Sequence, residues 1–295
     1  LVGSEMCIRD SYMIVVPEGS SLTLKDVTID GGAVWNGAKD ATIGRGKENS
    51  GVEATSAMIY NFGTLTVKSG TILENNDNTT TSGAIAMKDE ETGEYTFPSV
   101  TDKVRFGGAV LNGGLMKISG GTIRNNNVGW RGAGIASYGK IEMTGGTISG
   151  NYARNGWGDG GAIYLSGVKN DTGEDYTASD ASYCTISDGN FTNNKSDGAG
   201  GAVCADGYSI LYVKGGAFKN NAAATTGGGI NVYSSCLRMS GGTISENTAV
   251  STNDSTGNGG GLNLTVGSVA DITGGTIENN QSNSCLLYTS DAADE

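Results

Sequence analysis

The chain has 295 residues, a formal net charge of −12 at neutral pH, 50 Gly, 2 Pro and no His. This length suffices for one elongated domain, and the acidic balance argues against binding of nucleic acid or a polybasic membrane contact, which both need clustered Lys and Arg. The glycines recur at regular distances from apolar residues, which indicates a repeat fold and not a disordered linker.

The two ends of the chain do not continue this repeat. Residues 1–11 read LVGSEMCIRDS and residues 285–295 read CLLYTSDAADE. Both resemble translated adapter DNA from sequencing libraries, with native terminal strands as the alternative. We therefore leave them out of the fold prediction and expect one β-helix domain over residues 12–284, truncated at both ends. On this expectation, any signal peptide, anchor or transporter domain, and any membrane attachment through it, lies outside the sequence.

Eight copies of a short motif follow, each centred on an Ile or Phe that we use as its reference position: Ile29, Ile72, Ile123, Ile148, Phe191, Phe218, Ile244 and Ile277. Apolar residues stand five and seven positions earlier, and the residue between them is mostly polar. This alternation predicts a β-strand with one buried face. Gly stands two positions before the reference residue in seven of the eight copies, which predicts a sharp corner with positive φ.

Asn stands three positions after the reference residue in the same seven copies: Asn75, Asn126, Asn151, Asn194, Asn221, Asn247 and Asn280. Asn tolerates the left-handed backbone of a turn, and amides stacked once per coil can form a ladder. We favour this ladder over metal or substrate binding by the column.

A third strand is predicted at a Gly-Gly-Ala-Val type segment, as at residues 107–110 and 200–203. Three strands per repeat, with 25 to 27 residues between the uninterrupted copies, predict an all-β fold: a right-handed parallel β-helix, or three-sided solenoid, of about eight coils. Longer spacings place insertions near residues 37–53, 78–105 and 167–181, at the corners of the coils.

Three cysteines remain between the excluded ends: Cys184, Cys204 and Cys236. An odd number without short spacing fits neither a disulfide framework nor a zinc site. We predict isolated thiols in or beside the core, and we assign no metal site and no cofactor.

The pairing of Gly-Gly-Ala-Ile/Val, at residues 160–163 and 200–203, with Phe-x-x-Asn, at residues 191–194 and 218–221, carries a family resemblance. It resembles the repeat of chlamydial polymorphic outer-membrane proteins and is similar to adhesin-like β-helix proteins of gut bacteria, which belong to the pectin-lyase-like superfamily. The resemblance implies the exported stalk of an adhesin, located extracellularly or on the cell surface of a bacterium. Ile replaces Phe in most copies, so we carry over the architecture and not the chlamydial assignment.

Two functions remain open. The first is a stalk or binding surface for a glycan or another host or cell-surface component. The second is a polysaccharide-degrading enzyme, either a pectate-lyase-like lyase or a glycoside hydrolase, because such enzymes share this fold. The Gly-His-Gly segment of polygalacturonases is absent, and Arg124 and Arg131 meet Asp159 only if their loops fold together. We therefore expect a non-enzyme and assign no catalytic residue.

The best binding candidate in the sequence is an aromatic pair. Trp130 and Trp157 lie 27 residues apart, about one coil, after the Asn turn. Their rings could stack as a platform for sugars, with Tyr152 nearby. The alternative, which we favour, is that they cover the corner with apolar surface.

Overall fold

The computed structural model describes residues 14–31, 57–78, 87–88, 95–96, 106–154, 158–167, 182–251, 257–283 and 285–289. Within these ranges every regular element is a strand, and no helix is long and apolar enough to cross a membrane. The predicted insertions fall almost wholly outside these ranges; an antiparallel pair, β8 (Met87–Lys88) and β9 (Tyr95–Thr96), lies in the second.

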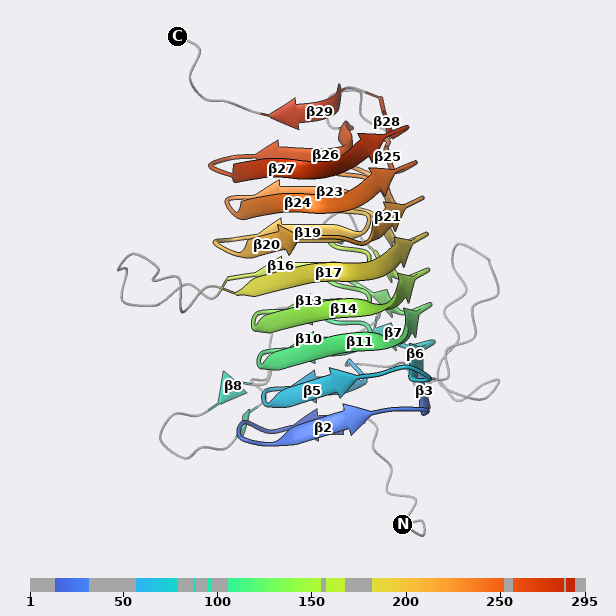
Figure 1. Ribbon diagram of the computed structural model, residues 1–295. Coiled ribbons are helices and arrows are strands. Elements are labelled where there is room, and N and C mark those ends of the chain that lie inside the picture. Colours follow the sequence, from blue (N-terminus) through green and yellow to red (C-terminus); the bar gives the residue numbers. More distant parts are fainter. Residues whose placement is uncertain are drawn as a thin grey trace, which may run out of the picture.

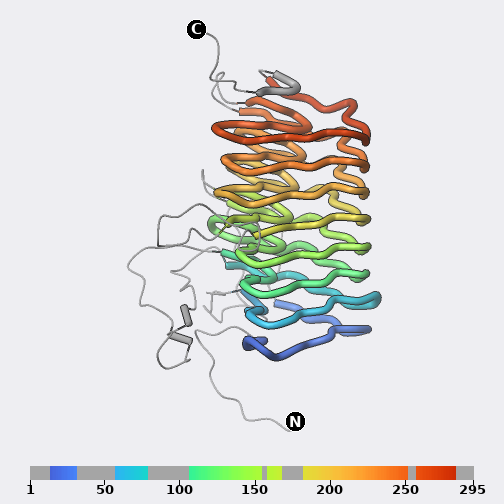
Figure 2. Tube along the Cα trace, turned by 60° about the vertical axis from the view of Figure 1, so that its left-hand side comes forward, coloured from blue at the N-terminus to red at the C-terminus, as the bar shows by residue number. Residues whose placement is uncertain are grey.

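The other strands form three long parallel sheets, and successive repeats add neighbouring strands to each (Figures 1 and 2). Sheet A contains β1 (Ile14–Val16), β4 (Ile59–Asn61), β10 (Val110–Asn112), β13 (Ile135–Ser137), β16 (Ile163–Ser166), β19 (Val203–Asp206), β23 (Ile230–Tyr233), β26 (Asn258–Thr265) and β29 (Cys285–Thr289). Sheet C contains two-residue strands: β7 (Asp77–Asn78), β12 (Asn127–Val128), β15 (Tyr152–Ala153), β18 (Lys195–Ser196), β22 (Ala222–Ala223), β25 (Thr248–Ala249) and β28 (Gln281–Ser282).

Sheet B carries the motif with the reference residue. Its strands are β2 (Ser21–Leu24), β3 (Thr28–Asp30), β5 (Thr64–Val67), β6 (Ile72–Glu74), β11 (Leu115–Arg124), β14 (Lys140–Ser149), β17 (Tyr183–Thr192), β20 (Ile210–Val213), β21 (Ala217–Lys219), β24 (Cys236–Ser245) and β27 (Val269–Glu278). The parallel sheets are consistent with the predicted β-helical solenoid. The short strands of sheet C were not predicted.

The Gly corner lies inside a strand and does not separate two strands in β11, β14, β17, β24 and β27. Each of these runs for ten residues, and the pairing shifts register at the corner, as between Ser119 and Thr122. The predicted positive φ is confirmed, for example 84° at Gly121 and 103° at Gly146. A bulge built on Gly therefore turns the chain while the strand continues.

One repeat is out of step with the sequence prediction. Ile123 pairs with Leu73 and not with Ile72, and Ile29 also pairs with Leu73. Leu73 is buried, whereas Ile72 is partly exposed. Six positions separate Val67 from Leu73, where the other repeats have five, so this corner holds one extra residue.

The Asn ladder is present, with one member corrected. Asn76, and not Asn75, joins the column, since its main-chain N donates to Asn126 Oδ1 at 3.1 Å. From Asn126 onward each Asn side chain donates Nδ2 to the Oδ1 of the next at 2.9 or 3.0 Å: Asn151, Asn194, Asn221, Asn247 and Asn280.

The left-handed residue is not the ladder Asn but the residue before it. Asn75, Asn125, Asn193, Asn220 and Asn279 have φ between 53° and 57°. The sequence prediction had therefore assigned the turn conformation to the wrong position. The ladder Asn itself has its side chain inside the protein, where its amide also donates to main-chain carbonyls, as from Asn194 Nδ2 to Ile148 O at 2.9 Å.

The core contains the apolar residues that stand at the predicted inward positions. Ile141, Met143 and Ile148 of β14 are fully buried, and the rings of Phe191 and Phe218 stack at 4.6 Å and 8°. Several strands of sheet A are buried on both faces, among them β4, β10 and β13. In β16, for example, Ile163, Tyr164 and Leu165 are at most 1% exposed, which explains this apolar run.

The structure describes only a small part of the two adapter-like segments. Residues 1–11 lie outside the described residues, whereas β29, within residues 285–295, pairs in parallel with β26. The adapter origin and the boundaries of the domain stay predictions.

Candidate functional site

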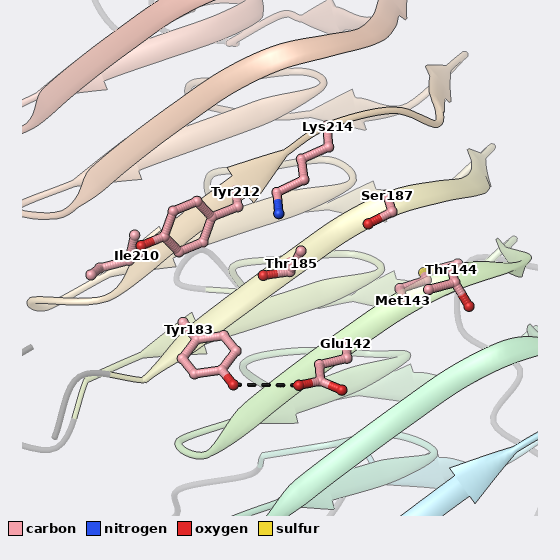
Figure 3. Close-up of a pocket in the computed structure, with 9 residues that line it drawn as sticks. All are labelled: Glu142, Met143, Thr144, Tyr183, Thr185, Ser187, Ile210, Tyr212 and Lys214. Carbon is pink, nitrogen blue, oxygen red and sulfur yellow. Dashed lines mark hydrogen bonds between the residues drawn. The ribbon is translucent and has the colours of Figure 1, made fainter. Parts of the chain in front are cut away.

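A groove of about 500 Å³ crosses the outer face of sheet B over three neighbouring strands, β14, β17 and β20 (Figure 3). The strands run in parallel and in register, with Thr185 opposite Tyr212 and Glu142 opposite Thr185. A groove that crosses strands follows the direction in which repeats stack. Its lining is Glu142, Met143, Thr144, Tyr183, Thr185, Ser187, Ile210, Tyr212 and Lys214.

Two tyrosines from adjacent strands give the groove its aromatic surface. Tyr183 donates its phenol hydrogen to Glu142 Oε1 at 3.5 Å, and Lys140 Nζ lies 5.5 Å from the centre of the Tyr183 ring. Partial burial, followed by the neighbouring Glu142 carboxylate, raises the pKa of Tyr183, so its phenol stays protonated at neutral pH. Tyr212 lies one strand further along, above Thr185. Aromatic faces next to hydroxyl and charged groups are the usual make-up of sites that hold sugars.

In the sequence, the residues of this groove are recognisable only as outward-facing positions of successive repeats. Glu142, Thr185 and Tyr212 alternate with buried neighbours and were predicted to be a solvated face. Tyr183 stands two residues before Thr185, on the same face of the strand. Tyr183 and Tyr212 stand in diagonal positions on the same face of adjacent strands, opposite Ile210 and Thr185 respectively, and this pair of outward tyrosines was the signal that the sequence held.

The predicted aromatic platform is only partly described. Trp157 lies outside the described residues. Trp130 stacks on Phe106 at 6.2 Å and 17°, and the Arg131 guanidinium lies 5.8 Å from the centre of its ring. The Trp130 Nε1 atom is buried and has no hydrogen-bond partner among the described residues. These contacts fit the alternative reading of Trp130 as a cover over the corner.

Tyr152 has a separate environment on sheet C. Its phenol donates to Asp197 Oδ1 at 2.7 Å. Lys195 Nζ lies 4.5 Å and the Arg154 guanidinium 5.0 Å from the centre of the Tyr152 ring. The described contacts do not join Tyr152 to Trp130. Burial, together with the hydrogen bond to Asp197, raises the pKa of Tyr152.

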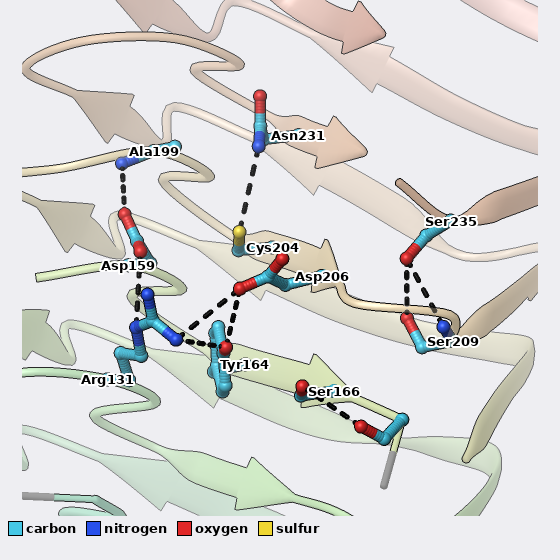
Figure 4. Close-up of polar contacts among 11 residues, drawn as sticks. Arg131, Asp159, Tyr164, Ser166, Ala199, Cys204, Asp206, Ser209, Asn231 and Ser235 are labelled. Atoms are coloured by element: carbon cyan, nitrogen blue, oxygen red, sulfur yellow. Dashed lines mark hydrogen bonds and ion pairs between the residues drawn. The ribbon is translucent and has the colours of Figure 1, made fainter. Parts of the chain in front are cut away.

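A second polar cluster surrounds Arg131 on the outer side of sheet A (Figure 4). Its Nε atom lies 3.4 Å from Asp159 Oδ2, and its Nη1 atom lies 3.4 Å from Asp206 Oδ2 and contacts the Tyr164 hydroxyl. Tyr164 also donates to Asp206 Oδ2 at 2.7 Å, and the main-chain N of Ala199 donates to Asp159 Oδ1 at 2.8 Å. The fold thus joins Arg131 to Asp159, which spacing in the sequence had left open.

The electrostatics of this cluster are those of a partly desolvated ion network. Burial raises the pKa of Asp159 above its usual range, although the Ala199 hydrogen bond and Arg131 oppose the shift. Burial alone would lower the pKa of Arg131, but Tyr164, Asp159 and Asp206 outweigh it and raise that pKa. Arg131 therefore stays charged and links residues from three successive repeats.

Cys184, Cys204 and Cys236 are free thiols, as predicted. Cys184 and Cys204 are buried, and Cys236 is partly buried. Burial raises the pKa of Cys184 to about 12. In the part of the chain that the structure describes, no group of three or more acidic, Cys or His side chains is arranged to hold a metal ion.

Comparison of the chain with protein-family models, curated proteins and solved structures found no match. The proposed function below therefore rests on the fold and the groove alone.

Proposed function

We propose that this protein is a right-handed, three-sided β-helix of about eight coils that binds glycans in the groove over β14, β17 and β20. We further propose that it belongs to a secreted or cell-surface bacterial protein, with the solenoid as a stalk or binding surface of the adhesin-like, pectin-lyase-like type. A sheet of stacked strands presents one continuous face over several repeats, because main-chain hydrogen bonds hold each strand to the next.

The observation that carries glycan binding is the groove itself. Tyr183 and Tyr212 offer ring faces on adjacent strands, and Thr144, Thr185 and Ser187 offer hydroxyl groups beside them. A pyranose ring has apolar C–H faces and polar edges, which suit this combination of aromatic rings and hydroxyls.

The test is glycan binding by the purified chain on a glycan array, followed by calorimetry with a bound glycan. We expect Tyr212→Ala to weaken binding by at least about tenfold, or ~1.4 kcal/mol. Tyr233→Ala is the matched control, since Tyr233 is an exposed tyrosine on sheet A, 44% accessible, and does not line the groove. Equal losses in both variants, or no binding of any glycan by the folded protein, would contradict the proposal.

The aromatic pair of the sequence prediction can be separated in the same experiment. If Trp157→Ala abolishes binding while Tyr212→Ala leaves it intact, then the platform near Trp130, Trp157 and Tyr152 is the glycan site and the groove is not. We expect the reverse.

A polysaccharide-degrading enzyme is the second candidate, and the Arg131 cluster is the observation that favours it. Two carboxyl groups, Asp159 and Asp206, lie around one Arg at side-chain exposures of 16% and 21%. In a hydrolase one carboxyl group protonates the leaving glycosidic oxygen while the other removes a proton from the attacking water. New reducing ends or unsaturated products from uronate polymers, lost in Asp206→Asn, would support this function. We expect no product, because both acids already pair with Arg131.

A further inference from the structure

Basic side chains gather on one face of this acidic protein. The described part of the chain contains twelve Lys and Arg residues, and six of them lie on the outer face of sheet B before its Gly corner: Lys25, Lys68, Lys117, Lys140, Lys214 and Arg238. Each comes from a different repeat. The same face carries four acidic residues, Asp26, Glu142, Asp188 and Asp271, so it is net positive in a chain with a net charge of −12.

Most of these cations form no ion pair with an acidic residue in the described part of the chain. Away from this face, Arg124 bonds Glu74 at 2.6 Å and Lys219 lies 3.0 Å from Glu246. On this face, Lys25 lies 3.9 Å from Asp26, and Lys140 contacts the Tyr183 ring. The other four, Lys68, Lys117, Lys214 and Arg238, make no ion pair within the described residues.

The local charge decides what such a face attracts. At physiological salt the Debye length is about 8 Å, so acidic groups on the other faces are largely screened from a ligand in the groove. Lys214 lines the groove, and Lys117 and Arg238 stand in the outward column on its two sides, next to Glu142 and Tyr212 respectively. The cations thus extend the groove along the stacking direction.

We propose that the groove and these basic side chains bind a linear anionic glycan that runs across the strands, along the axis of the solenoid. This inference rests on the proposed glycan binding and specifies its ligand. Neighbouring strands lie about 4.8 Å apart, close to the length of one pyranose unit, so cations that occur at most once per repeat suit a polymer with one charge per sugar or every second sugar. The tyrosines and hydroxyls of the groove contact the rings, and Lys117, Lys214 and Arg238 face the acidic groups.

Nucleic acid is the other polyanion to be weighed. Its charges lie about 3.4 Å apart along each strand, and about 1.7 Å apart along the duplex axis. This density exceeds one cation per ~4.8 Å, and some repeats contribute none. The sparse cations and the row of hydroxyls therefore favour a glycan.

The test measures binding of the purified full chain to four probes at 50 and 200 mM salt: heparin, polygalacturonate, neutral dextran and single-stranded oligothymidine. We expect heparin or polygalacturonate to bind, with at least about a fivefold weaker affinity at the higher salt. The stronger of the two identifies sulfate or carboxylate as the recognised group. The triple variant Lys117→Gln, Lys214→Gln, Arg238→Gln should lose at least tenfold, whereas Lys219→Gln, on the far side of the corner, should lose less than twofold.

Each other outcome contradicts the inference. Binding of neutral dextran alone, or anionic binding that the triple variant leaves unchanged, overturns the anionic ligand but leaves glycan binding intact. Tighter binding of oligothymidine than of either glycan overturns it in favour of nucleic acid. No binding of any glycan here or on the array overturns the proposed function as well. If circular dichroism shows that the triple variant is misfolded, the single charge reversal Lys214→Glu, at an exposed position, takes its place.

Discussion

Asn151 donates two hydrogen bonds to a single acceptor, Oδ1 of Asn194, one from its main-chain N at 3.2 Å and one from Nδ2 at 3.0 Å. Asn194 in turn donates its own Nδ2 to Asn221 Oδ1 at 3.0 Å. One buried side chain therefore satisfies groups in the repeat before it and in the repeat after it. The ladder couples repeats that the backbone sheets already join.

Replacement of a central ladder Asn should destabilise the whole stack. Asn194→Ala removes the acceptor that the buried main-chain N and Nδ2 of Asn151 share, although Nδ2 keeps its bond to Ile123 O. A buried group left unsatisfied costs about 1–3 kcal/mol. We expect a loss of ~3 kcal/mol in the free energy of unfolding by urea. Asn193→Gly is the matched control, since Asn193 has a φ of 57° and Gly adopts that conformation readily. A loss in the control that equals the loss in Asn194→Ala would contradict the ladder's role.

The two glycines of one corner should differ in their tolerance of Ala. Gly146 has a φ of 103°, and a Cβ there would lie 3.0 Å from Gly120 O. A Cβ on Gly145 would come no closer than 3.3 Å to its nearest neighbour, Ser119 O, and its backbone has no positive φ. We expect Gly146→Ala to cost at least about 2 kcal/mol and Gly145→Ala less than half as much. Thermal unfolding of both variants, monitored by circular dichroism, measures the difference; equal melting temperatures would refute it.

Thiol reactivity should separate Cys184, Cys204 and Cys236. Cys184 is fully buried and burial raises its pKa to about 12, so it carries almost no thiolate at pH 8. Burial, with the nearby Asp159 and Asp206, raises the pKa of Cys204 as well. In a background with Cys7 and Cys285 changed to Ser, we expect a thiol reagent to label Cys236 in the native protein and to label all three only in urea. Mass spectrometry of the peptides identifies the labelled residue, and native labelling of Cys184 would show that this core is open.

The pH dependence of stability should reveal the desolvation of Asp159. A folded-state pKa raised above the ordinary value of 3.8 means that the native protein holds this proton more tightly than the unfolded chain does. Its contribution to stability therefore falls as the pH rises from about 4 through the raised pKa, and it is constant above that pH. Urea titrations from pH 3.5 to 7 on the wild type and Asp159→Asn should give a difference in stability that declines with pH. A difference that grows with pH would show that Arg131 outweighs burial and lowers this pKa.

The sequence allowed the repeat, the inward apolar columns, the Gly corners and most of the ladder to be predicted, because these depend on residue type at a fixed spacing. The errors arose where spacing changes. Ile72 was taken for Leu73, and Asn75 for Asn76. In a repeat with one more residue, Ile72 and Asn75 stand at the expected distance, and an apolar Leu and a second Asn stand one position later. Register in a parallel stack is set by the neighbouring repeats, and only the pairing with Ile123 and Asn126 resolves it.

The groove and the Arg131 cluster were not predicted, because both join residues of different repeats through lateral contacts. Tyr183 and Tyr212 are 29 positions apart, and Arg131 and Asp206 are 75 apart, with an insertion of unpredictable path between them. The direction in which each side chain leaves its strand was predictable from the alternation. Which neighbours it then meets depends on the offset between repeats.

The extra residue at the corner before Leu73 has an implication for how such a chain changes over evolutionary time. The buried side chains on either side, Val67 and Leu73, still lie over Ile118 and Ile123. A codon gained or lost at this bend leaves the interior pattern intact, whereas the same change within a straight segment would turn every following side chain to the opposite face. The bends are therefore the places where repeat lengths can drift, and insertions and deletions among descendants of this sequence should accumulate there.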